Sequence, residues 1–192
     1  TRATKAFKAL TEIKAAEDYF VFGGYGLIYG DPTKPDLTGD FFTKSTDYML
    51  SQWDKRPLLY HHAMDGATKG NPVIGNIVSI EADDIGLWVE SQLDMRHAYG
   101  DAIKRLIQQG ALSYSSDSAE QFVERKSAKH GTRELTRWGV VGVSVTPTPA
   151  EFRLMPVSEI KGLYQSAGIE IPEAFKSAEI SSHEHDPPPV NH

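Results

Sequence analysis

A chain of 192 residues, of which 40% are hydrophobic and 24% charged, is long enough to bury a core as a single domain. Its formal net charge of -6 disfavours a nucleic-acid-binding surface, because phosphate binding needs concentrated Lys and Arg. The lack of cysteine excludes disulfides, Cys-ligated zinc and thiol nucleophiles, and no apolar run is long enough to span a bilayer. We therefore expect no nucleic-acid partner, no membrane partner and no cofactor.

Composition predicts one folded domain between two less ordered segments. Residues 1–18 are mixed and charged, and we expect them to be loosely held. Residues 19–180 carry the apolar periodicity of a folded unit. Residues 181–192 are poor in apolar side chains and contain three consecutive prolines, so we expect a disordered tail.

The first half of the folded region reads mainly as strands. Residues 19–29 are aromatic and β-branched but interrupted by glycines, which is typical of a sharply bent strand in a small barrel. A helix is predicted over 48–55 and a brief strand over 57–60. Residues 73–81 and 86–93 form the clearest predicted hairpin, because turn residues separate two runs of strand-forming residues.

The second half begins with the best-defined helix, over 101–109, for which Asp101 is a candidate cap and Gly110 a left-handed stop. Together with the first half, this pattern predicts an α+β fold, a mostly antiparallel β-barrel with surrounding helices. The remaining predicted elements are strands over 119–126 and 134–145 and short helices over 157–167 and 172–177.

A cluster of hydroxyls follows the central helix, with four serines inside six residues. A serine becomes a nucleophile only when a base accepts its proton and donors stabilise the oxyanion. Candidate bases are His61 and His62, which end the predicted strand over 57–60. A metal site formed by these histidines and Asp65 is disfavoured, because adjacent strand residues point to opposite faces unless the chain turns there.

Five stretches occur in an order that is specific as a set: 23–26, 37–42, 57–62 with 72–75, 83–88, and 110–118 leading to 143–151. In this order the chain resembles the prohead (capsid maturation) serine proteases of tailed bacteriophages, which share the fold of herpesvirus assemblins. The resemblance implies a herpesvirus protease-like barrel over 19–180 and a serine endopeptidase activity that needs no cofactor or metal.

The resemblance also implies the site residues. The base corresponds to His62, and the nucleophile corresponds best to Ser115, which follows the helix-ending glycine in a pattern similar to Ser-x-Gly. Ser113 and Ser116 are the alternatives, because a shift of one residue in a strand reverses the face.

Two positions depart from the family pattern. Asp117 stands where the family usually has glycine, so it adds a charge close to the expected oxyanion. Gly142 stands where many members have an acidic residue, and a glycine cannot orient an imidazole. In well-studied triads, loss of the acidic member lowers turnover roughly 10⁴-fold, about 5 kcal/mol of barrier. The residues left open as substitutes for that acidic member are Glu134, Glu120 and His130.

The implied function is cleavage of the major capsid protein precursor and its scaffold segment inside the procapsid, in the host cytoplasm. A homodimer is a further expectation from the resemblance. The alternative, motivated by Asp117 and Gly142, is a catalytically weakened or inactive protease-fold module that acts in capsid assembly. Cleavage specificity depends on loops that the sequence does not place.

Overall fold

The computed structural model describes residues 18–64 and 70–159. The segment expected to be loosely held and the tail over 181–192 lie outside these ranges, except for Asp18. The helix predicted over 172–177 and nearly all of that over 157–167 also lie outside the described residues. Within the described ranges, no helix is long and apolar enough to cross a membrane.

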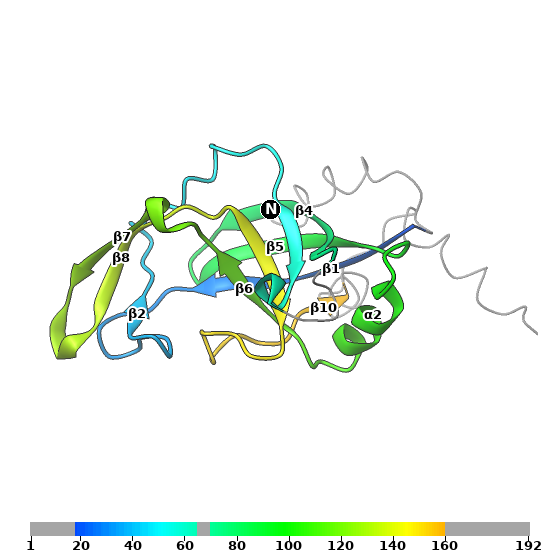
Figure 1. Cartoon of the computed structure of the whole chain (residues 1–192). Helices are drawn as coiled ribbons and strands as arrows, with labels where there is room; N and C mark the ends of the chain where they lie inside the picture. The colour runs from blue at the N-terminus through cyan, green and yellow to red at the C-terminus, as the bar shows by residue number, and fades with distance from the viewer. Residues whose placement is uncertain (1–17, 65–69, 160–192) are drawn as a thin grey trace, which may run out of the picture.

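The described residues form two β-sheets (Figure 1). The strands of the larger sheet are β1 (Tyr19–Ile28), β3 (Pro57–Tyr60), β4 (Val73–Ala82), β5 (Gly86–Asp94), β6 (Ser113–Asp117), β9 (Gly142–Thr146) and β10 (Ser158–Glu159). The strands of the smaller sheet are β2 (Asp40–Phe41), β7 (Val123–Ser127) and β8 (Arg133–Trp138). The helical elements are α2 (Gly100–Gln108) and the 3₁₀ turns η1 (His61–Ala63), η2 (Glu120–Phe122) and η3 (Lys129–Gly131).

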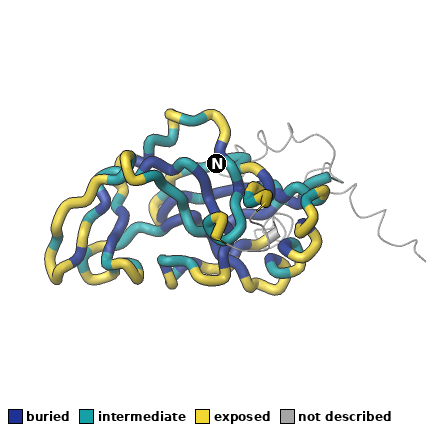
Figure 2. The backbone as a smooth tube through the Cα atoms, in the orientation of Figure 1, coloured by how far each residue is buried: buried dark blue, intermediate teal, exposed yellow. Residues whose placement is uncertain are grey.

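The larger sheet has the order β10-β1-β5-β4-β3-β9-β6 and curls into a nearly closed barrel. Its pairs are antiparallel except for β3 with β9, which is parallel. Figure 2 shows that buried residues gather in this sheet, whereas β7 of the smaller sheet is mostly exposed. The predicted barrel is therefore confirmed in outline, with a separate small sheet in the order β2-β8-β7 beside it.

Glycine bends β1 as the sequence predicts. The register of the β1–β5 pair shifts between Tyr25 and Leu27. A Cβ on the intervening Gly26 would lie 2.7 Å from a methyl carbon of Val89, so only glycine fits this close approach. The β4–β5 hairpin is also confirmed, and the carboxylate of Asp83 accepts the two backbone N–H groups that close its turn.

Tyr114 fixes the position of β6 on the barrel. Its ring is fully buried and stacks on Phe22 with 5.6 Å between centroids, and its hydroxyl donates to Ser91 Oγ at 2.6 Å. Because side chains alternate along a strand, Ser113, Ser115 and Asp117 face away from this contact. A one-residue slip would expose Tyr114, so the core specifies which β6 residues reach the opposite face.

One helix prediction was right and one was wrong. The predicted central helix is α2, which buries Ile103 and Ile107 and is followed by Gly110 at a φ of 68°, although Asp101 lies in the first turn and not at the cap. Residues 48–55 form turns instead of a helix.

The cause of that error is the buried Arg56. Its guanidinium donates to the carbonyls of Met49, Leu50 and Trp53, so these groups are turned toward one side chain and not along a helix axis. Met49 also has a φ of 51°, outside the helical region. Within the described ranges α2 is the one α-helix, so the expected surrounding helices are absent there.

The smaller sheet accounts for two further differences. The strand predicted over 119–126 begins later, as β7 after η2, and the one predicted over 134–145 is divided into β8 and β9. Asp40 joins the strands of the small sheet, because its buried carboxylate accepts from Arg125 Nε at 2.9 Å and Arg133 Nε at 2.6 Å. These contacts join β2 to both strands of the β7–β8 hairpin.

Candidate active site

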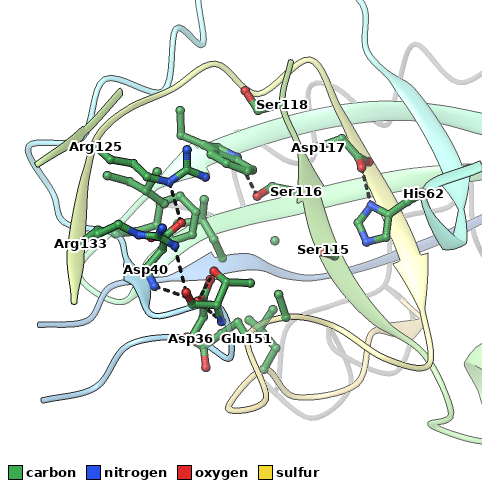
Figure 3. A pocket seen from close by; sticks show the side chains of 18 residues that line it. Asp36, Asp40, His62, Ser115, Ser116, Asp117, Ser118, Arg125, Arg133 and Glu151 are labelled. Atoms are coloured by element: carbon green, nitrogen blue, oxygen red, sulfur yellow. Dashed lines mark hydrogen bonds and ion pairs between the residues drawn. The ribbon is translucent and has the colours of Figure 1, made fainter. Parts of the chain in front are cut away.

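A cavity of about 350 Å³ lies where β1 and β6 of the barrel meet the smaller sheet. His62 and Ser115 both line it, so the predicted base and nucleophile share one open space (Figure 3). Charged side chains of the smaller sheet, including Asp40, Arg125 and Arg133, also line this cavity.

His61, His62 and Ala63 form a left-handed turn at the end of β3. Their φ angles are 45°, 55° and 58°, in a region that costs an L-residue about 1–2 kcal/mol. Two hydroxyls of β9 hold this turn. Thr146 Oγ1 lies 2.7 Å from His61 Nδ1, and Ser144 Oγ accepts the backbone N–H of His62 at 3.2 Å. A strained backbone persists when its surroundings fix it in this way.

The imidazole of His62 binds the carboxylate of Asp117. The distance between His62 Nδ1 and Asp117 Oδ1 is 2.5 Å, and the two side chains are 27% and 17% exposed. This hydrogen bond raises the pKa of His62 above its usual value, with partial burial opposing the shift and the charge of Asp117 adding to it. Because Nδ1 faces a carboxylate, the neutral ring carries its proton there and leaves Nε2 free to accept another.

The three candidate serines occupy different environments. Ser115 lies on the side of β6 that faces His62 and Asp117, as Figure 3 shows. Ser116 lies on the other side, where its Oγ accepts from Trp138 Nε1 at 3.1 Å. Ser113 is 8% exposed and is not among the residues that line the cavity. Ser116 also lines the cavity, so it differs from Ser115 in its direction on β6 and its bond to Trp138, and not in access to the cavity.

None of the three suggested substitutes for the acidic member binds His62. Glu134 lies 3.4 Å from Thr43 Oγ1 in the smaller sheet. Glu120 is exposed in η2, and His130 is exposed in η3 at the end of the β7–β8 hairpin.

Asp117 contacts His62 instead, whereas from the sequence we considered only the charge that it adds close to an expected oxyanion. The sequence did contain a signal for this contact. Ser115 and Asp117 are two residues apart, so their side chains lie on one face of β6. The pairing of Asp117 with Gly142 across the β6–β9 ladder could not be read from local sequence, because it depends on the strand register.

The histidines do not form a metal centre with their neighbours among the described residues. The chain does turn at His61 and His62, but each ring takes its own partner and their centroids are 6.5 Å apart. Asp65 lies outside the described residues, and within the described ranges no group of three His, Asp or Glu side chains could hold a metal ion.

Comparison with known proteins gives a family and several similar solved structures. One of these structures is the KSHV protease, from a crystal structure in complex with a hexapeptide phosphonate inhibitor, with 10% sequence identity and a TM-score of 0.35. The match covers 67% of this chain and 59% of that chain, so it spans less than two thirds of that protein's length. No curated protein matches the chain. A model of the caudovirus prohead serine proteases matches residues 8–154, most of the sequence, and the chain therefore belongs to the prohead serine protease family.

Proposed function

We propose that this protein is a serine endopeptidase of capsid maturation in which Ser115 is the nucleophile and His62 the general base. The observation that carries the proposal is the hydrogen bond between His62 Nδ1 and Asp117 Oδ1, formed on the face of β6 that also presents Ser115. Family membership supports the reaction class, and the shared cavity supports access for a substrate.

The chemistry follows from the orientation of His62. Its Nε2 accepts the proton of Ser115 Oγ as that oxygen attacks the scissile carbonyl carbon. Asp117 holds the imidazole in the productive tautomer and stabilises the imidazolium. His62 then protonates the leaving amine, and a water molecule activated by the same ring hydrolyses the acyl-enzyme. Backbone N–H groups supply the oxyanion hole.

The proposed substrate is the capsid protein precursor with its scaffold segment, cut inside the procapsid in the host cytoplasm. This assignment rests on the family. Self-cleavage, at a sequence similar to the site cut in the capsid precursor, is a further part of the proposal. A homodimer stays a prediction from the resemblance.

The alternative, a weakened or inactive module in capsid assembly, was motivated by Asp117 and Gly142. The contact between Asp117 and His62 supports the enzyme instead, because the imidazole has a carboxylate partner although position 142 has none.

The test is reaction of the purified chain with a fluorophosphonate, followed by intact mass and peptide mapping. We expect one adduct, on Ser115, and none on the Ser115→Ala variant. Ser116→Ala is the matched control, because it removes the neighbouring hydroxyl on the other side of the same strand.

The variants are then co-expressed with the capsid precursor. We expect cleavage to be lost with Ser115→Ala and retained with Ser116→Ala. Retention of cleavage by Ser115→Ala would remove Ser115 from the mechanism. Lack of any adduct on a folded chain would favour the assembly module.

A further inference from the structure

We propose that Ser144 is a positioning residue of this site, which locks the carboxylate of Asp117 and the backbone of His62 together. The inference rests on the proposed function and adds a member whose hydroxyl binds the proposed acidic residue and the backbone of the proposed base. Ser144 lies in the middle of β9 and is fully buried.

The Ser144 hydroxyl makes two hydrogen bonds of opposite sense. It donates to Asp117 Oδ2 at 2.7 Å and accepts the backbone N–H of His62 at 3.2 Å. Asp117 Oδ1 in turn binds His62 Nδ1. The three residues therefore close a ring of hydrogen bonds that contains the backbone and the side chain of the same histidine.

This ring controls the direction of the carboxylate. With Oδ2 held by Ser144, rotation of the Asp117 side chain is restricted and Oδ1 stays directed at the imidazole. Without the hydroxyl, Asp117 Oδ2 would lose its hydrogen-bond donor, although the Asp117 side chain is only 17% exposed. The carboxylate would then turn toward another donor. Ser144 and Ser115 are partners across the β6–β9 ladder, so the residue that fixes the base lies opposite the proposed nucleophile.

The second bond stabilises the left-handed backbone of His62. His62 has a φ of 55°, and its backbone N–H donates to Ser144 Oγ on β9. Loss of that acceptor removes one of the contacts that hold the strained turn. Both effects of Ser144 thus converge on the position of one imidazole, and a displacement of about 1 Å at a catalytic group lowers rates by about 10²-fold.

The experiment measures the rate constant for fluorophosphonate reaction at Ser115 in Ser144→Ala. We expect a loss of about 10- to 100-fold. The matched control is Thr46→Val, because the Thr46 hydroxyl is buried and makes the same two kinds of hydrogen bond. It donates to the carbonyl of Leu135 at 2.7 Å and accepts the backbone N–H of Thr43 at 3.0 Å, beside the smaller sheet. That variant should stay within about threefold of the parent chain, as expected for an uncoupled site.

A double-substitution cycle separates positioning from general damage. Because one of the two bonds of Ser144 goes to Asp117 and the other to the His62 backbone, Ser144→Ala should slow the Asp117→Ala variant by less than it slows the parent chain. Ser144→Cys keeps the size of the side chain with a weaker donor and should react at an intermediate rate. It also serves as the test variant if Ser144→Ala does not fold.

A second readout does not depend on activity. The short bond between His62 and Asp117 should give a far-downfield proton resonance for Nδ1–H, and this signal should shift or vanish in Ser144→Ala but persist in Thr46→Val. An unchanged resonance together with an unchanged reaction rate in Ser144→Ala would overturn the proposal. If the parent chain does not react at all, the proposed function fails, and the resonance alone decides the role of Ser144.

Discussion

Asp117 and Gly142 are direct partners across the β6–β9 ladder, and the carboxylate of Asp117 reaches His62 from the strand that also carries Ser115. Side chains of such partners share a face, with Cβ atoms about 4.5–5.5 Å apart. The carboxylate that contacts His62 therefore comes from the position that faces Gly142 on the neighbouring strand. We propose that the two departures from the family pattern compensate for each other.

This pairing predicts that a carboxylate placed at position 142 can restore activity lost by removal of the carboxylate at position 117. Asp117→Gly should lower kcat for peptide cleavage by about 10³- to 10⁴-fold, because His62 loses the partner that fixes its tautomer. Adding Gly142→Glu should recover at least about tenfold of that loss, since the two positions couple through one imidazole. The measurement is steady-state cleavage of a peptide substrate by both variants.

Gly142→Glu alone is the control for this exchange. A Cβ at position 142 would lie 3.2 Å from the carbonyl oxygen of Pro57, so some loss of thermal stability is expected and is monitored by circular dichroism. If the double variant folds yet cleaves no faster than Asp117→Gly, the two positions are not interchangeable.

The pKa of His62 gives a prediction about pH. A general base acts in its neutral form, so kcat/KM rises as pH increases through that pKa. Asp117 raises the pKa through its hydrogen bond and charge, while burial lowers it. Asp117→Asn should therefore lower the pKa of His62 and move the acidic limb of the profile to lower pH. An NMR titration of the imidazole checks this, with Ser116→Ala as the control that leaves the limb in place.

The same shift links the site to stability. The folded-state pKa of His62 lies above its unfolded value, so this pair stabilises the fold fully below the unfolded pKa. That contribution is lost as pH rises through the folded-state pKa. Asp117→Asn should remove this dependence from denaturant unfolding measured over that range, whereas an unchanged slope would contradict it.

The left-handed turn is testable at Ala63, which is exposed and has a φ of 58°. Ala63→Gly should leave the free energy of unfolding unchanged or raise it by up to about 1 kcal/mol, because glycine adopts this conformation without strain. Ala63→Val should lower it by about 1–3 kcal/mol, because a β-branched residue is strained there. Urea unfolding of both variants measures the difference. Equal stabilities would mean that the backbone leaves the left-handed region in solution.

The buried carboxylate of Asp40 should matter more than an exposed ion pair. Its side chain is 4% exposed and is shared by Arg125 and Arg133. Replacing both arginines by alanine should lower the free energy of unfolding by about 3–5 kcal/mol, because the buried charge is left unpaired. Lys44→Ala, which breaks the exposed pair with Asp84, should change it far less, because solvent screens such a pair. Similar losses in both would show that Asp40 becomes solvated when its partners are removed.

Local sequence determined the elements whose causes are local. The glycine bend of β1, the Asp83 turn and the stop of α2 at Gly110 each depend on neighbouring residues, and each occurs as predicted. The ordered motifs selected His62 and Ser115, and the structure places both on one cavity.

Only the tertiary structure decided the partner of His62 and the course of residues 48–55. Arg56 replaces helical hydrogen bonds in that segment with contacts to its own guanidinium. Asp117 meets His62 across 55 positions of sequence because the register of β6 and β9 and a left-handed turn bring them together. A hydrogen bond of this kind depends on the relative placement of strands, and the burial of distant side chains such as Tyr114 sets that placement.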